Sequence, residues 1–166
     1  MDGVNRKERK VVMKLSELTA ELEILQKQAK RILKESEYDE YGDLSSLSYD
    51  GKNADALLLV DEYRRILEKL SDIEWTLSYL QRPVVFTDTL TMDESGRYMT
   101  TNEEITYTSG RTIEFAYTEE KYNEGIEAFE DVPCWRVSRV EHNGEEYYIV
   151  GYSMVKLEGL RVRVRR

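Results

Sequence analysis

Cysteine and histidine are almost absent from this chain of 166 residues. Cys134 is the only cysteine and His142 is the only histidine. A single cysteine allows no intramolecular disulfide, which fits a reducing compartment such as the cytoplasm. One cysteine and one histidine are also too few ligands for an ordinary zinc site, so we expect no metal.

Sequence motifs that identify enzymes are missing as well. The glycines are scattered singly, and neither GxxxxGK nor GxGxxG occurs, so no phosphate-binding loop is expected. His142 flanks a turn and Cys134 opens a strand, and neither has the neighbours that activate a base or a thiol. Adjacent carboxylates such as Glu103 and Glu104 have no defined spacing. We predict no catalytic residue and no cofactor, with an enzyme of unrecognised type as the third choice.

Long apolar runs are also lacking. No run approaches the length of a membrane-spanning helix, and the first residues, MDGVNRKERKVVMKL, lack the apolar centre of a signal peptide. We expect a cytoplasmic protein with no membrane association. Hydrophobic residues make up 40% of the chain, which is enough for a modest core.

What the chain has in excess is negative charge, with a formal net charge of -9. Residues 37–133 contain 23 acidic and eight basic residues, whereas both flanking segments are weakly basic. An acidic surface repels phosphate and attracts basic protein surfaces. The charge distribution therefore favours a basic protein partner, and we do not expect direct binding of nucleic acid.

The first half of the chain carries two heptad repeats of apolar residues. Each repeat predicts a helix that buries one stripe against a partner helix. The first stripe comprises Val11, Leu15, Leu18, Leu22, Leu25, Ala29 and Ile32, and the second comprises Ala56, Leu59, Tyr63, Ile66, Leu70, Ile73, Leu77 and Leu80. We expect the two stripes to bury each other, with dimerisation through the helices as the alternative.

These repeats set the expected boundaries of a helical domain. The first helix should run from about Arg6 to Ser36, and Asn53 or Asp55 should cap the second. Pro83 should end the second helix. Residues 1–82 are therefore predicted to form an antiparallel, coiled-coil-like helical hairpin.

Short strands with turns between them are expected in residues 83–166. Segments rich in β-branched residues alternate with turn signals, of which Asn143-Gly144 is the strongest. The acidic stretch Thr118–Pro133 interrupts this strand pattern. The predicted fold class is thus α+β, with a small antiparallel β domain after the helices.

The last strand is basic. Arg161, Arg163 and Arg165 alternate with Val162 and Val164, so the arginines should share one face and the valines should enter the core. We expect a structural strand whose arginines face water or acidic residues of the same protein. The alternative is a nucleic-acid-associated regulator that uses these arginines together with the basic residues among positions 6–10.

Two acidic stretches with interleaved tyrosines are the candidate partner-binding surfaces. Carboxylates can steer association and tyrosine rings can anchor it, although solubilising loops would look the same. The candidate residues are Tyr38, Asp39, Glu40, Tyr41 and Asp43 in the first stretch, and Glu119, Glu120, Glu124, Glu127, Glu130 and Asp131 in the second.

The second half resembles a known family. The matching residues are Gly96-Arg97-Tyr98, Thr108-Ser109-Gly110, Ile113-Glu114, Trp135, Arg139-Val140-Glu141-His142-Asn143-Gly144, Tyr147-Tyr148, Gly159-Leu160, Arg161 and Arg163. Their order and spacing resemble a domain-of-unknown-function family carried by phages, plasmids and conjugative elements of Gram-positive bacteria. The resemblance implies a compact antiparallel β domain, SH3-like or barrel-like, and it implies no catalytic residue.

The resemblance also suggests a class of function. Small, acidic, non-catalytic proteins of mobile elements include anti-CRISPR proteins, which present carboxylates where a target expects phosphates. We therefore expect a non-enzymatic inhibitor or adaptor in the cytoplasm of a bacterial host, with a type II CRISPR nuclease as the candidate basic partner.

Overall fold

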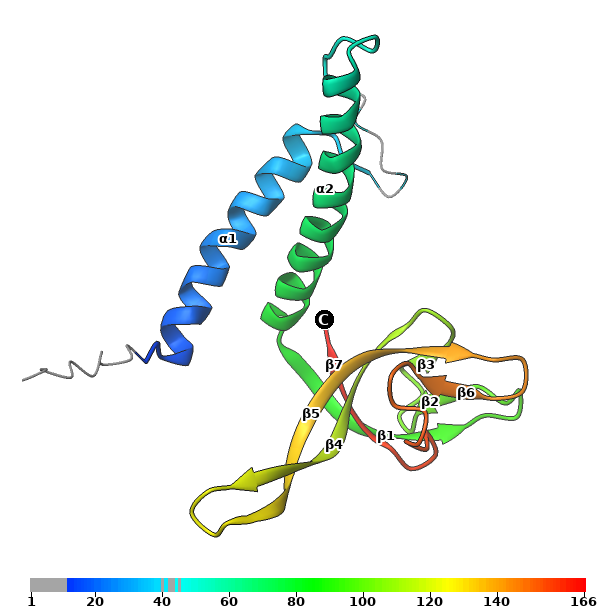
Figure 1. Ribbon diagram of the computed structural model, residues 1–166. Coiled ribbons are helices and arrows are strands. Elements are labelled where there is room, and N and C mark those ends of the chain that lie inside the picture. The colour runs from blue at the N-terminus through cyan, green and yellow to red at the C-terminus, as the bar shows by residue number, and fades with distance from the viewer. Residues whose placement is uncertain (1–11, 40, 42–43, 45) are drawn as a thin grey trace, which may run out of the picture. The chain divides into compact units, whose positions relative to one another are not determined.

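The computed structural model describes residues 12–39, 41, 44 and 46–166. The chain divides into two compact units, Met1–Gln81 and Arg82–Arg166. The first unit contains two helices and the second contains a curled antiparallel sheet, so the fold is α+β as expected (Figure 1). No helix in the described ranges is long and apolar enough to cross a membrane.

The helices are α1 (Leu15–Glu35) and α2 (Ala54–Gln81). Asn53 caps α2, because its side-chain oxygen accepts the backbone N–H groups of Asp55 and Ala56 at 2.9 and 3.1 Å. This confirms Asn53 as the cap. The expected start of the first helix near Arg6 lies outside the described residues, and residues 12–14 are not helical.

The prediction that the heptad stripes bury each other is wrong for most of their positions. Only Ala29 of the first stripe is buried, and Leu25 and Ile66 are 39% and 56% exposed. The residues through which the two helices contact each other lie beside the predicted heptad stripes, and some of them are polar. Gln26 donates to Ser78 at 2.8 Å, and Lys30 forms an ion pair with Glu74 at 3.2 Å. Val11 lies outside the described residues.

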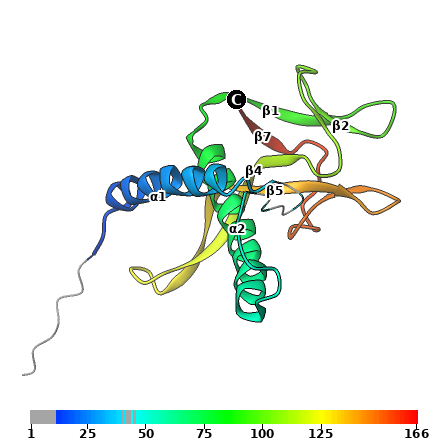
Figure 2. The same ribbon diagram turned by 90° about the horizontal axis from the view of Figure 1, so that it is seen from above.

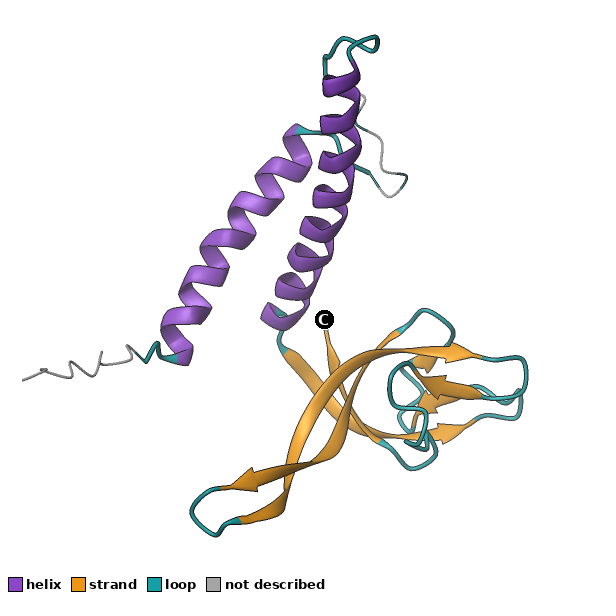
Figure 3. Ribbon diagram, in the orientation of Figure 1, coloured by secondary structure: helices purple, strands orange, loops and turns teal. Residues whose placement is uncertain are grey.

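The second unit contains one seven-stranded sheet in which every pairing is antiparallel. The strands follow the spatial order β3-β2-β1-β7-β4-β5-β6 and curl into a half-barrel (Figure 3). Their bounds are β1 Val84–Met92, β2 Tyr98–Thr100, β3 Thr106–Tyr107, β4 Thr112–Asn123, β5 Ala128–His142, β6 Tyr147–Ile149 and β7 Arg161–Arg165. β7, the last strand in the sequence, thus lies between β1 and β4.

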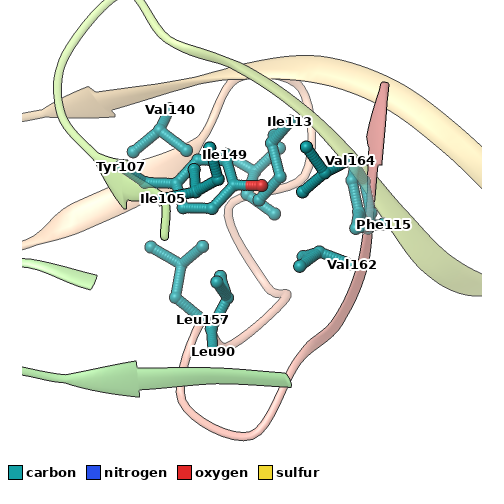
Figure 4. Close-up of a cluster of buried hydrophobic side chains, with 10 residues drawn as sticks. All are labelled: Leu90, Ile105, Tyr107, Ile113, Phe115, Val140, Ile149, Leu157, Val162 and Val164. Carbon is teal, nitrogen blue, oxygen red and sulfur yellow. The ribbon is translucent and has the colours of Figure 1, made fainter. Parts of the chain in front are cut away.

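The curl of the sheet encloses a core of aliphatic and aromatic side chains (Figure 4). Phe115 is fully buried and makes edge-to-face contacts with Tyr117 and Tyr152. Val162 and Val164 are 0% and 7% exposed, which confirms that the valines of the last strand enter the core. The period-two pattern therefore located the inner face of β7 correctly.

The Asn-Gly turn differs in detail from the two-residue hairpin that the dipeptide suggests. The last pair before the loop is His142 with Tyr147, so the loop has four residues. Gly144 takes a φ of 102°, and the side chain of Asn143 accepts the backbone N–H of Glu145 and of Glu146. The asparagine acts here as a side-chain acceptor, a common role in turns.

We predict that residues 82–166 fold without the helices. The fragment retains the whole sheet and its core, including the backbone carbonyl of Arg82, which accepts a bond from Arg165 at 2.8 Å. Thermal unfolding followed by circular dichroism should show a cooperative, β-rich transition. A fragment that is unfolded in native buffer would show that the two units depend on each other.

Candidate functional site

A long hairpin extends from the sheet, and it contains the second acidic stretch. β4 and β5 stay in register from Thr112 opposite Arg139 to Asn123 opposite Ala128. The expectation that residues 118–133 interrupt the strand pattern is therefore wrong. These residues form the outer part of the hairpin, which we call the arm (Thr118–Pro133), and the arm extends beyond the rest of the sheet (Figures 1 and 2).

One face of the arm neutralises its own charges. Glu119 forms ion pairs with Arg136 at 2.5 Å and with Lys121 at 3.2 Å, and Asn123 donates to Glu130 at 3.1 Å. The hydrogen bond from Lys121, assisted by the charge of Arg136, lowers the pKa of Glu119. We call this the paired face, and its members are Glu119, Lys121, Asn123, Ala128, Glu130 and Val132.

The opposite face of the arm combines acid and aromatic groups. Glu120 lies directly opposite Asp131, and in the described structure neither carboxylate has an ion pair. Tyr122 lies opposite Phe129, with ring centroids 5.3 Å apart, and the two residues are 54% and 65% exposed. We call this the aromatic face, and its members are Thr118, Glu120, Tyr122, Phe129, Asp131 and Pro133.

The two opposed carboxylates of the aromatic face do not stabilise the hairpin. Like charges directly opposite each other on a sheet are destabilising. The contact between Tyr122 and Phe129 does stabilise it, but more than half of each residue stays exposed, and that area is buried only when a partner covers it. A surface of this kind can hold a cationic side chain, because carboxylates attract it and ring faces favour it.

A cavity lies at the foot of the aromatic face, where β4 and β7 diverge. Its volume is about 470 Å³, and its lining includes Thr118, Trp135 and Arg161. The guanidinium of Arg163 lies 4.2 Å from the centroid of the Trp135 ring. Residues two apart on a strand point to the same face of the sheet, so Trp135 lies on the same face as Phe129, Asp131 and Pro133. The aromatic face of the arm therefore continues onto the body of the sheet.

The arginines of β7 mostly bind carboxylates of the same unit. Glu114 is 2% exposed and pairs with both Arg163 and Arg165, the latter at 2.7 Å. Burial alone would raise the pKa of Glu114, but the hydrogen bonds from Arg165 and Arg163 outweigh it and lower that pKa. Arg166 pairs with Glu104 at 2.8 Å. Arg161 is exposed, and we find no ion pair for it in the described structure.

The first acidic stretch belongs to the helical unit. Tyr38 packs against the cluster of Leu44, Val60 and Leu67, so it is not a freely displayed anchor. Burial, followed by the charges of nearby carboxylates, raises the pKa of Tyr38. Tyr41 is 85% exposed. A cavity of about 290 Å³ is lined by Leu33, Tyr38, Asp39, Glu68, Ser71 and Asp72. Glu40 and Asp43 lie outside the described residues.

The tip of the arm carries Glu124 and Glu127 beside Ile126, which is 60% exposed. Sequence reasoning selected the carboxylates and missed Tyr122, Phe129 and Ile126. No alternation of apolar and polar residues pointed to these three, because Tyr122 is the only hydrophobic residue among positions 118–123. The acidity of the segment concealed its strand character.

The single histidine and the single cysteine of the chain lie in the second unit. His142 is exposed, and its Nδ1 accepts the backbone N–H of Gly144 at 3.1 Å. Cys134 is half-buried. In the part of the chain that the structure describes, no group of three or more acidic, histidine or cysteine side chains could hold a metal ion.

Comparison with known protein families gives a match within the second unit. No curated protein matches the chain, and no solved structure does either. A family model described as "Domain of unknown function (DUF5348)" matches residues 88–164, which run from within β1 to within β7. The C-terminal part is therefore similar to a domain-of-unknown-function family, as the sequence resemblance indicated.

Proposed function

We propose that this protein is a non-enzymatic binding protein that docks on a basic surface of another protein through the aromatic face of its arm. The observation that carries this proposal is the pairing of Glu120 with Asp131 next to two exposed rings, Tyr122 and Phe129. The carboxylates supply charge complementarity and the rings supply apolar area. The paired face lacks both features, since its charges are neutralised within the hairpin.

The finer proposal is that the protein is an inhibitor or adaptor from a mobile genetic element, with a type II CRISPR nuclease as the candidate target. An acidic projection can occupy a basic groove that otherwise holds nucleic acid. The support is the net charge of -9 and the similarity of residues 88–164 to a domain-of-unknown-function family. The cytoplasm of the bacterial host is the corresponding location.

The finer architecture is part of the same proposal. We propose an antiparallel helical hairpin, supported by the contacts of Gln26 with Ser78 and of Lys30 with Glu74. In these contacts the residue numbers rise along α1 as they fall along α2. We also propose an SH3-like barrel for residues 83–166, supported by the curl of the sheet.

The second candidate function is a regulator that binds nucleic acid through Arg161, Arg163 and Arg165. Arg163 and Arg165 are engaged with Glu114, so a phosphate would have to compete with a buried carboxylate. Arg161 favours this candidate because it is exposed at the rim of the cavity beside Trp135. The basic residues of positions 6–10 lie outside the described residues.

We predict that reversing the charges of the aromatic face weakens partner binding by slowing association. The full-length chain carrying Glu120→Lys with Asp131→Lys should associate with its partner about 10-fold more slowly than wild type or worse, because electrostatic steering acts on the association rate. Binding by wild type should weaken as salt rises. The measurement is capture from a host lysate with identification by mass spectrometry, followed by biosensor kinetics with the captured protein and with a type II CRISPR nuclease.

The matched control carries the same change in net charge on the other side of the arm. Glu119→Lys with Glu130→Lys should retain most of the binding, since those carboxylates already face basic or amide groups. Equal losses in the two variants would mean that only total charge matters. Tight retention of duplex DNA or RNA by the wild-type chain at physiological salt would favour the nucleic-acid regulator instead.

A further inference from the structure

The helical unit has a second apolar stripe that its own contacts leave exposed. On both helices the exposed residue immediately precedes a more buried one, as with Leu25 before Gln26 and Ile66 before Leu67. We call this stripe the heptad face. It comprises Leu18, Leu25 and Ile32 of α1 with Leu59, Ile66 and Ile73 of α2, which are between 39% and 56% exposed.

The two halves of this stripe lie on one side of the helix pair. Neighbouring residues on a helix are about 100° apart around its axis. On each helix the exposed stripe is therefore turned by about 100° from the residues that contact the other helix, in the same direction relative to the course of the chain. The residue numbers rise along α1 as they fall along α2, as Gln26–Ser78 and Lys30–Glu74 show. Equal rotations on helices of opposite direction bring both stripes to the same side. The heptad face is therefore one continuous surface.

We propose that the heptad face binds the heptad face of a second copy of this chain, giving a dimer with a four-helix core. A seven-residue apolar repeat packs best on helices with the same repeat, and this chain carries two of them. A two-fold interface also uses the same patch on both copies, so no further surface is required.

Area and charge both suit a second copy. The six side chains expose on the order of 500 Å² of apolar surface per copy, before their polar neighbours are added, against about 800 Å² per partner in a standard interface. α1 carries four acidic and four basic residues and α2 carries six acidic and three basic residues, so the two helices together have a net charge of -3, against -9 for the whole chain. Like-charge repulsion between two copies is therefore absent from α1 and modest on α2.

The contact within one chain is too small to account for the heptad repeats. Gln26 and Ala29 are the buried residues of α1, and Val60, Leu67 and Tyr79 are those of α2. Helices held by so few buried residues have most of their apolar surface still available. Pairing with a second copy would bury the side chains that give the sequence its most regular pattern.

The test is light scattering coupled to size-exclusion chromatography on the full-length chain. We expect a mass of twice 19.6 kDa at tens of micromolar, and a monomer after sufficient dilution. Ile66→Glu with Ile73→Glu should be monomeric at the same concentration, a loss of at least 100-fold in dimer affinity. Leu58→Glu, at a residue 61% exposed on the far side of α2, should remain dimeric.

Circular dichroism at 222 nm shows whether each variant keeps its helices. If the double variant loses helicity, Ile66→Gln with Leu25→Gln replaces it with a smaller perturbation. A wild-type chain that is monomeric at tens of micromolar overturns the proposal, whether the heptad face then stays open or is covered by residues 82–166. The proposal is also overturned if the Ile66→Glu with Ile73→Glu variant and the Leu58→Glu variant have the same mass in solution.

Discussion

Glu114→Ala is expected to lower the free energy of unfolding of the β unit by about 3–5 kcal/mol, which is the usual cost of removing one partner from a buried ion pair. Glu114 is 2% exposed, and Arg163 and Arg165 both direct their guanidinium groups to its carboxylate. Without that carboxylate two cations share a poorly hydrated site. Their repulsion and lost hydrogen bonds should weaken the junction of β4 and β7.

Urea unfolding in a Trp75→Phe background measures this effect, because Trp135 is then the only tryptophan and reports on the β unit. The control is Glu119→Gln on the same strand, where the ion pairs are open to solvent and little change is expected. Replacing Glu114, Arg163 and Arg165 together by apolar residues should recover much of the loss. A stable Glu114→Ala variant would show that the ion pairs add nothing to the sheet.

The same carboxylate makes the stability of the β unit depend on pH. The pKa of Glu114 is lower in the folded chain than its ordinary value of 4.5, so the unfolded chain takes up the proton first. The stabilisation is complete above pH 4.5 and is lost as the pH falls below 4.5 through the folded-state pKa. Unfolding curves measured across that range should show a steeper loss for wild type than for Glu114→Ala.

Leu67→Asp is expected to destabilise the helical unit by several kcal/mol, enough to unfold it in native buffer. Leu67 is 7% exposed and packs with Leu44 and Val60. An aspartate there would place a carboxylate within an apolar cluster, which is among the costliest single changes. The ellipticity at 222 nm and its thermal transition measure the loss.

The control for this prediction lies on the same helix. Leu58→Asp introduces the same side chain at a position that is 61% exposed and outside the heptad face, so the helices should persist. If the two variants melt alike, the cluster around Leu67 does not stabilise the helices. The comparison tests burial directly, because residue type and helix are matched.

Short-range patterns predicted much of the fold. The alternation of arginine with valine over residues 161–165 located an inner and an outer face on β7. Two of the three outer arginines, Arg163 and Arg165, pair with Glu114 of the same unit. Asn53 as a helix cap also followed from local chemistry, since the amides at a helix start are satisfied by the nearest acceptor. Both features depend only on residues that are close together in the sequence, so they can be predicted from it.

Features that depend on distant partners could not be predicted in this way. The heptad repeat marks an apolar stripe, but Leu25 and Gln26 compete for the contact, and only the pairing of Gln26 with Ser78 decides between them. The prediction for the arm was wrong for a related reason. Its charges suggest a loop until Lys121 is seen opposite Glu130, because cross-strand pairing is what makes such a segment a strand.

The open sides of the arm have a consequence for solubility. β7 pairs with β4 only at Glu114 and Phe115, so farther out the hairpin is a two-stranded ribbon with backbone groups available to another ribbon. Ribbons of this kind are templates for edge-to-edge aggregation, and charged side chains are the usual protection. Stacked arms would bring Glu120 and Asp131 against their own copies. Resistance to fibril formation and recognition of a partner would then rest on the same carboxylates.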